Sequence, residues 1–324
     1  MRLTIDQPSS RARDSGPYEY EPIPYKSVDY LLDDPYSYYH AMTVNIARLA
    51  AWGKQTSQVS NVFDPPGYPP AFFLGTRKRV EHYQWFLREV GTCLVPADMR
   101  TPEDARSMLV NLPEVEMCQT EILDYLFAHQ DYCGFTHQNM NTDNASFWRD
   151  EQGRVQSGFI DWGRFKQDNF ARGLTNGYMC TDLCEFLQAE DERLVRAFAG
   201  AYNEAGGSLD ADRLWEQYLV AWLLLGLSIV DLPRQILFTS PHTTEDGWKT
   251  IDDYKDPRIF HMPNYTNGTV AMCRNFACYW HSKDLGSVWQ TWKAKHLTPT
   301  RLEEVARQSK KLEEQAAATA KPIS

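Results

Sequence analysis

A polar stretch near the middle of the chain carries the side chains best suited to do chemistry. His137, Asn139 and Asn144 follow the spacing His-x-Asn-x-x-x-x-Asn, and Asp161 closes a strand-like run further on. Phosphoryl transfer needs a group that orients and deprotonates the acceptor hydroxyl, an oxygen ligand that holds Mg²⁺ beside it, and a carboxylate that binds Mg²⁺ from the opposite side. Kinase-like folds take the first two from one loop and the third from the end of the next hairpin. The spacing therefore predicts a phosphoryl-transfer centre at these four positions.

The same stretch resembles the aminoglycoside phosphotransferase family and its choline-kinase-like relatives. Their loops read like His-Gly-Asp-x-x-x-x-Asn, and their metal-binding Asp lies in Ile-Asp-Trp or Ile-Asp-Leu-Gly-Arg. The matching strings here are Asp143-Asn144 and Ser157-Gly-Phe-Ile-Asp-Trp-Gly-Arg164. Residues 46–52, 182–186 and 202–219 show weaker similarity to family segments, and they occur in the same order as in the family. The resemblance thus covers about residues 36–232, and its most specific part is 134–164.

The resemblance implies a role for each matching residue. Asn144 and Asp161 would be ligands of Mg²⁺, and ATP would be the phosphoryl donor. His137 would brace the loop without carrying protons. Asp182 would be structural as well, and could anchor the catalytic loop.

Asn139 occupies the position where the family has its catalytic Asp. A carboxylate there accepts a proton, whereas an amide can hydrogen-bond a hydroxyl but has no comparable basicity. General-base catalysis contributes about 10²–10⁴-fold, so positioning and metal alone would leave only a residual rate. Asp143 is the candidate for a substitute base, although relatives often carry Asp there beside the catalytic one, which favours a turn-shaping role. The chain is therefore expected to be catalytically impaired.

The upstream sequence lacks the usual means of gripping ATP, which are a glycine-rich loop, a strand lysine and a helix glutamate paired with it. No two glycines are separated by a single residue, and the upstream lysines are Lys26, Lys54 and Lys78. Glu81 could pair with Lys54, but the helix that begins at Thr76 fits better as an insertion within the catalytic lobe. We therefore expect the nucleotide lobe to be absent or highly reduced, and the sequence identifies no nucleotide-binding residues.

Helices and one hairpin are expected to position these side chains. Helical periodicity runs over 38–52, 76–90, 115–129, 183–187, 194–202, 214–230 and 272–292. Residues 134–144 are expected to be a loop, and 145–148 and 154–160 to be strands joined by the turn Asp150-Glu-Gln-Gly153. Residues 233–270 are loop-rich. The expected class is α+β and predominantly helical, a protein-kinase-like C-terminal lobe with a short β-hairpin.

Three regions are expected along the chain. Residues 1–35, rich in Pro, Tyr, Asp and Ser, form an extended arm, and residues 36–300 form the catalytic lobe. Residues 301–324 form a C-terminal amphipathic helix and tail, which the capping box Thr300-Arg-Leu-Glu303 would open. The arm and the last helix are the segments through which a complex partner would dock.

The composition of the chain indicates which kinds of partner and which cellular compartment to expect. The net charge of −10 and the pI near 5.3 argue against a nonspecific grip on nucleic acid. The seven cysteines contain no Cys-x-x-Cys pair and fit buried free thiols in a reducing compartment. No signal-peptide core and no apolar stretch of membrane length are evident. A cytoplasmic protein that binds neither membrane nor nucleic acid is expected.

Three functions agree with these observations. The first is a pseudokinase-like binding or scaffold protein that keeps the lobe and a residual Mg²⁺ or phosphate site. The second is an active ATP- and Mg²⁺-dependent kinase that phosphorylates a small-molecule hydroxyl. The third is a structural subunit of a larger complex, with a protein partner in place of a small-molecule substrate. The alternative to all three functions is that residues 134–161 are only an Asn-rich turn that leads into an ordinary hairpin. Asn and Asp favour turns because of their backbone preferences alone.

Overall fold

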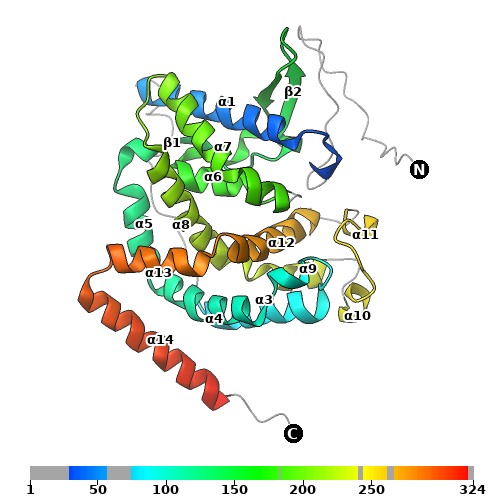
Figure 1. Ribbon diagram of the computed structural model, residues 1–324, viewed down its shortest axis with the longest axis vertical. Coiled ribbons are helices and arrows are strands. Elements are labelled where there is room, and N and C mark those ends of the chain that lie inside the picture. Colours follow the sequence, from blue (N-terminus) through cyan, green and yellow to red (C-terminus); the bar gives the residue numbers. More distant parts are fainter. Residues whose placement is uncertain (1–28, 57–73, 182–183, 240–243, 261–265, 320–324) are drawn as a thin grey trace.

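The computed structural model describes residues 29–56, 74–181, 184–239, 244–260 and 266–319. This part of the chain is predominantly helical and carries two small antiparallel sheets (Figure 1). The predicted α+β class with a short hairpin is confirmed at this level. The α-helices are α1 (Pro35–Gln55), α3 (Thr76–Trp85), α4 (Pro102–Met117), α5 (Gln119–Phe127), α6 (Phe170–Tyr178), α7 (Cys184–Glu204), α8 (Ala211–Ile229), α9 (Leu232–Thr239), α10 (Glu245–Trp248), α11 (Pro257–Phe260), α12 (Thr266–Ser282), α13 (Leu285–His296) and α14 (Pro299–Thr319).

Several helices differ in extent from the prediction. The helix expected over 115–129 is two helices, because Cys118, with φ −110° and ψ 19°, ends α4 and precedes α5. Helix α4 begins earlier than expected, at Pro102, behind a capping box of Thr101 and Asp104. The runs expected over 183–187 and 194–202 are one continuous helix, α7. The region 272–292 is divided between α12 and α13. In each case the ends of the helices differ from those that the spacing of apolar residues indicates, because the stability of a helix in a protein depends mostly on tertiary packing.

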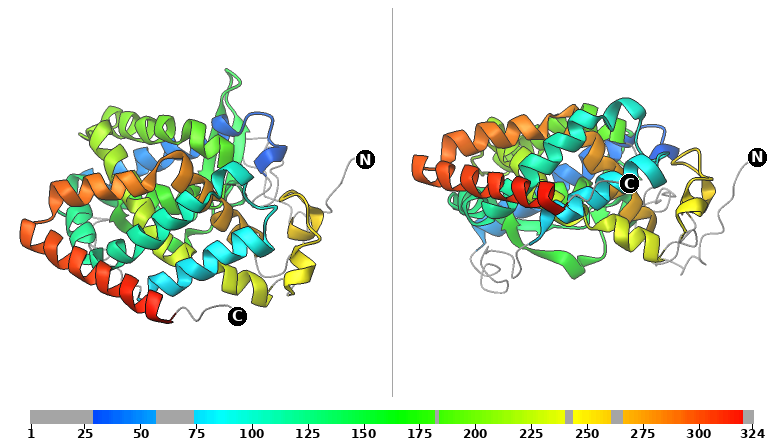
Figure 2. Two further views of the ribbon diagram at one scale, coloured as in Figure 1. Left: turned by 60° about the horizontal axis from the view of Figure 1, so that its bottom comes forward. Right: turned by 90° about the horizontal axis from the view of Figure 1, so that it is seen from below.

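The last helix begins before the predicted capping box. The Thr298 hydroxyl accepts a hydrogen bond from the Arg301 backbone N–H at 3.3 Å, so Thr298 caps α14 and Pro299 opens it. The box predicted at Thr300–Glu303 is therefore wrong by two residues. Val305 of α14 is buried, and α14 packs on α4 along the outside of the molecule (Figure 2).

The two sheets are nested in the sequence. Strand β1 (Cys133–His137) pairs with β4 (Phe165–Asn169), and between them the hairpin β2 (Ala145–Arg149) pairs with β3 (Val155–Phe159). The hairpin prediction is confirmed; its turn is held by Asp150, whose carboxylate accepts from the backbone N–H groups of Gln152 and Arg154. The loop predicted for 134–144 is wrong in its first part, which is strand β1. Neither β4 nor α6 was predicted.

Helix α1 and helix α8 organise the packing around these strands. Helix α1 contacts α7, β1 and β3, and α8 contacts α6, α7, α4 and α13. The hairpin extends past one end of α1, whereas α3, α4 and α14 form the opposite side of the molecule (Figure 1). The buried aromatic side chains of α8 and α12, including Trp222 and Tyr279, stack within this helical body.

No nucleotide lobe is evident in the parts of the chain that the structure describes. No strand precedes Cys133 among residues 29–56 and 74–132. Lys54 and Glu81 do not pair: Lys54 donates to the Gln130 carbonyl at 2.6 Å, and Glu81 forms an ion pair with Arg77. Helix α3 packs on α4 and α9 as part of the helical body.

The region predicted as an extended arm reaches the described residues only at its end. Residues 1–28 lie outside them, and Asp29–Leu31 form a 3-10 turn, which is not the extended conformation expected there. Asp29 is buried and accepts hydrogen bonds from Tyr39 of α1 and Thr142, each at 2.8 Å. This end of the predicted arm therefore belongs to the packed body.

No single helix in the described ranges combines the length and apolar character needed to cross a bilayer. Helix α8 and Leu232–Phe238 satisfy that condition only when taken together, as a pair bent by 41°.

Candidate functional site

The predicted loop and the end of the hairpin are held side by side by hydrogen bonds that involve Ile160. The Ile160 backbone N–H donates to the Asn144 carbonyl at 2.9 Å, and its carbonyl lies 3.0 Å from His137 Nε2. Strand β1 brings His137 to this point, and β3 brings Ile160 and Asp161. Two segments, the loop with His137 and Asn144 and the end of the hairpin with Ile160 and Asp161, thus share one end of the two sheets.

Asn139 and Asp161 meet directly. Asn139 Nδ2 donates to Asp161 Oδ2 at 3.4 Å, and Asn139 Oδ1 accepts from Asn141 Nδ2 at 2.6 Å. Because its oxygen is taken by Asn141, the Asn139 amide presents its donor side to the carboxylate. A carboxylate at position 139 would face Asp161 with like charge, so the amide is what allows this contact without a cation.

Asp161 has a backbone conformation that non-glycine residues seldom adopt. Its φ of 54° and ψ of 62° lie in the left-handed region, at a cost of about 1 kcal/mol. The surrounding hydrogen bonds of Ile160 and the 3-10 turn η6 (Trp162–Arg164) fix this conformation, which leaves the carboxylate exposed. Residues held in this region cluster at active sites and ligand clamps, and Asp and Asn also adopt it in ordinary turns.

Asn144 is oriented by the same loop. Its Nδ2 donates to the Asn139 carbonyl at 3.0 Å, so its side-chain oxygen faces the other way, and no described residue donates to that oxygen. The Asn144 oxygen and the Asp161 carboxylate are hard donors of the kind that Mg²⁺ prefers. No group of three His, Cys, Asp or Glu suited to a metal occurs among the described residues.

His137 is fully buried and packed between aromatic rings. Its ring stacks on Phe159 at 5.0 Å and meets Trp162 edge-on at 5.2 Å. Because the Ile160 carbonyl can only accept, Nε2 carries the proton in the neutral ring. Burial lowers the pKa of His137, although the contact with Ile160 and the nearby Asp161 oppose that shift. A buried neutral ring that binds a backbone carbonyl holds the start of the loop against the end of the hairpin.

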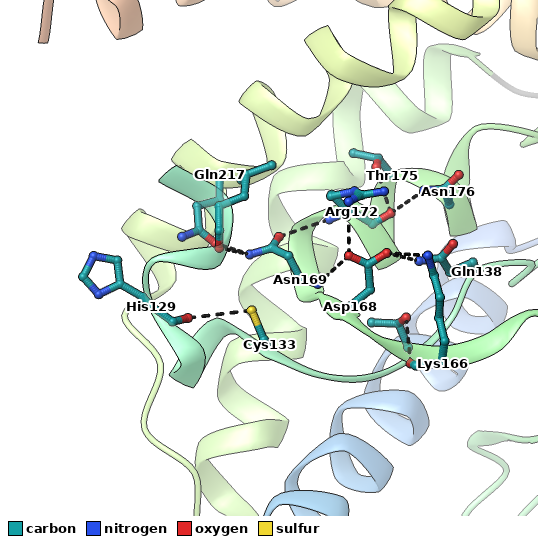
Figure 3. Close-up of polar contacts among 12 residues, drawn as sticks. His129, Cys133, Gln138, Lys166, Asp168, Asn169, Arg172, Thr175, Asn176 and Gln217 are labelled. Atoms are coloured by element: carbon teal, nitrogen blue, oxygen red, sulfur yellow. Dashed lines mark hydrogen bonds and ion pairs between the residues drawn. The ribbon is translucent and has the colours of Figure 1, made fainter. Parts of the chain in front are cut away.

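A second hydrogen-bond network positions Gln138, the residue between His137 and Asn139. Gln138 Nε2 donates to the buried carboxylate of Asp168 at 2.5 Å, and Lys166 Nζ lies 2.8 Å from the same oxygen. Arg172 of α6 approaches the other oxygen at 3.5 Å, so two cations balance the buried charge (Figure 3). Asp168 therefore ties the loop to β4 and α6.

The remaining predicted residues take different places. Asp143 lies in the 3-10 turn η5 (Thr142–Asn144), half-buried, and does not hydrogen-bond Asn139 or Asp161. Asp182 lies outside the described residues.

Sequence reasoning missed three contributors to the site. Asn141 orients Asn139, Asp168 holds Gln138, and Asp29 binds Thr142 within the loop. The only available signal was Gln138 itself, which stands where the family loop has Gly. Asn141 is one of several asparagines in the loop, and nothing in the sequence links Asp29 or Asp168 to it.

Comparison of the chain with known protein families, curated proteins and solved structures finds no match.

Proposed function

We propose that this chain is an impaired member of the aminoglycoside phosphotransferase and choline-kinase-like group, acting as a binding or scaffold protein built on a kinase-like catalytic lobe. The observation that carries this proposal is the contact of Asn139 with Asp161, at the place where loop and hairpin meet. An amide at the proton-accepting position holds the metal-binding carboxylate by a hydrogen bond. The centre keeps its shape and lacks its base.

Each residue of the proposed centre would have a separate role. Asp161 and Asn144 would hold Mg²⁺, which when bound would neutralise phosphate charge. Asn139 could orient an acceptor hydroxyl by a hydrogen bond, but its amide cannot take the proton, and the carboxylate beside it, Asp161, is the one that would hold the metal. His137 holds Ile160 and thereby the conformation of Asp161. Any transfer would rest on positioning alone, which leaves the rate about 10²–10⁴-fold below that with a base.

Calorimetric titration with Mg·ATP and with Mg·GTP tests this proposal, and Asp161→Ala is the control. An impaired binding or scaffold protein should show no micromolar affinity for either nucleotide. Micromolar binding of Mg·ATP that Asp161→Ala abolishes would contradict the scaffold function and favour an active enzyme.

The exposure of Asp161 favours one alternative, an active ATP- and Mg²⁺-dependent kinase for a small-molecule hydroxyl. Its carboxylate forms no ion pair with a described residue and is thus available to a metal. Asn139→Asp separates the two functions, because turnover should rise in an enzyme that merely tolerates Asn139. A chain without a nucleotide lobe should stay inert after the same change. A structural subunit, docking through residues 1–35 and 301–324, would also stay inert.

A further inference from the structure

Two buried cysteines from remote parts of the chain meet where α12 packs on α7. Cys184 is the first residue of α7, and Cys278 lies in α12, about ninety positions further along the sequence. Their exposed fractions are 2% and 0%, and their thiols are hydrogen-bonded to each other. The phosphoryl-transfer centre proposed above uses neither thiol, so the pair is a separate feature of the fold.

The contact between the two cysteines lies in an interface that other side chains of α12 already hold. Asn275 Nδ2 donates to the Thr181 carbonyl at 2.6 Å. Arg274 forms an ion pair with Glu185 at 2.8 Å. Because Arg274 and Asn275 precede Cys278 by one helical turn, all three side chains lie on the same face of α12. That face is therefore fixed against the start of α7 independently of the thiols.

A buried cation lies beside the two sulfur atoms. Arg274 is 2% exposed, and its charge interacts with both Cys184 and Cys278. The hydrogen bond to Cys278 and burial raise the pKa of the Cys184 thiol, and Arg274 opposes that rise. A neighbouring cation stabilises the thiolate, which is the form that attacks a disulfide. Since the pKa is nevertheless raised, the thiolate is scarce at neutral pH and exchange in the folded chain should be slow.

We propose that Cys184 and Cys278 form a reversible disulfide that links α7 to α12 under oxidising conditions, with a small disulfide such as oxidised glutathione as the oxidant. One cysteine thiolate attacks a glutathione sulfur and releases the first glutathione as a thiol. The second cysteine then attacks the mixed disulfide and releases the second glutathione. Two cysteine thiols are oxidised, and one oxidised glutathione is reduced to two glutathione thiols. This inference does not depend on the function proposed above.

The cross-link would make the stability of the protein depend on its redox state. It closes a loop of about ninety residues, and a disulfide across such a loop stabilises the folded state by restricting the unfolded chain. The contacts of Arg274 and Asn275 are present while the cysteines are free, so the bond joins segments that are already packed together.

Equilibration of the full chain with reduced and oxidised glutathione tests the proposal. At equal concentrations of the two, at least about nine-tenths of the chains should carry the disulfide, because a disulfide between thiols held in contact resists reduction by glutathione. Oxidised chains should then expose two fewer thiols in denaturant than reduced chains. Their Tm should be at least about 5 °C higher, and dithiothreitol should reverse both changes.

Slow exchange at buried thiols is separated from absence of the bond by a second condition. The same glutathione mixture is applied in urea below the unfolding midpoint, where reversible opening exposes the thiols while the folded state still predominates. The disulfide should form faster there. If it is absent under both conditions, the proposal is wrong.

Peptide mapping and variants locate the bond. Trypsin leaves Cys184 within residues 173–193 and Cys278 within residues 275–283, and the disulfide should join these two peptides. Cys180 shares the first peptide, so variants are needed to assign the sulfur. Cys184→Ala and Cys278→Ala should each abolish the joined peptide and the rise in Tm, whereas Cys180→Ala, the matched control, should retain both. A joined peptide that persists in Cys184→Ala and disappears in Cys180→Ala would refute the assignment.

Discussion

At the scale of single residues, the candidate site is distinguished by the side chain at position 139, which is an amide with a nitrogen donor where an Asp would have a second carboxylate oxygen. Asn139 donates to Asp161, whereas the catalytic Asp of the aminoglycoside phosphotransferases, which the sequence resemblance aligns with this position, would carry a negative charge. Asn141 and the Asn139 backbone carbonyl, which accepts from Asn144, keep the amide in that orientation. The contact is therefore satisfied without a cation, which makes the site stable in the absence of metal.

Replacing this amide by a carboxylate should make the stability of the protein depend on divalent metal. Asn139→Asp places two carboxylates in contact, and their repulsion should lower stability by about 1 kcal/mol at neutral pH. Mg²⁺ should restore part of the loss, whereas the wild-type Tm should not respond to Mg²⁺ alone. Thermal denaturation with Mg²⁺ and with EDTA measures both. In an Asp161→Asn background the substitution should no longer respond to metal; a response that persists there would show that the ion binds elsewhere.

His137 should make the protein less stable as the pH falls. Its folded-state pKa lies below the ordinary value of about 6.5 because the ring is buried, so the unfolded chain takes up a proton that the folded chain refuses. Stability should therefore be complete above about pH 7 and decline as the pH falls below about 6.5.

Urea denaturation at pH 7.5 and 5.5 measures that decline. His40 and His296 have lowered pKa values too, so the diagnostic quantity is the difference between wild type and His137→Gln. The variant should lose less stability between the two pH values than wild type does. His129→Gln, which removes an exposed histidine, is the matched control. An unchanged pH dependence in His137→Gln would show that His137 is not the source.

At the scale of elements, the position of the loop is set by close packing between β1 and α6. Gly173 of α6 lies against Thr136 of β1, where an added Cβ would come within 2.6 Å of Thr136 Cγ2 and 2.8 Å of Thr136 Cβ. These atoms sit next to the strand backbone and cannot move aside independently. Glycine at 173 thus permits the helix to approach the strand that leads into the site.

Gly173→Ala should separate this helix from the strand and destabilise the protein by about 1–3 kcal/mol. Gly200→Ala in α7 is the matched control, because nothing lies within 4 Å of its Cβ position and the site is exposed. It should stabilise the protein by about 0.5–1 kcal/mol through helix propensity. Chemical denaturation of both variants gives the comparison, and equal effects in the two would contradict close approach at Gly173.

At the scale of the whole molecule, a single large apolar core joins the helices to the strands. It includes four nearly inaccessible tryptophans, Trp222, Trp248, Trp280 and Trp289, and buries six of the seven cysteines. All seven cysteines are free, as the sequence predicted, and Cys93 is the one that is partly exposed.

The thiols should therefore react in a way that reports on the integrity of the core. Under native conditions a thiol reagent should modify at most Cys93, and slowly, because burial raises its pKa to about 11 and reaction requires the thiolate. All seven should react at once in denaturant. Counting modified thiols by absorbance with and without denaturant tests this, and Cys93→Ser should abolish the native reaction. Rapid modification of several thiols would show that the core opens.

Local order in the sequence was enough to predict the helical class and the hairpin. Helical periodicity, the Asp150–Gly153 turn and the His137–Asn144 spacing are all short-range features, and short-range features determine local backbone preference. The prediction failed at β1 and β4, whose pairing joins residues about thirty positions apart, and at the boundaries of α4 and α7.

The sequence by itself thus determined which side chains are available, and the tertiary structure decided what they contact. The spacing of His137, Asn139 and Asn144 can be read from the sequence. The orientation of the Asn139 amide, however, depends on its hydrogen bonds with Asn141 and Asp161 in the folded structure. The roles of Asp29 and Asp168 could not be predicted, because a buried carboxylate is identified by the distant donors that surround it. Composition and periodicity report on local conformation, whereas hydrogen-bond partners are chosen only when remote segments pack together.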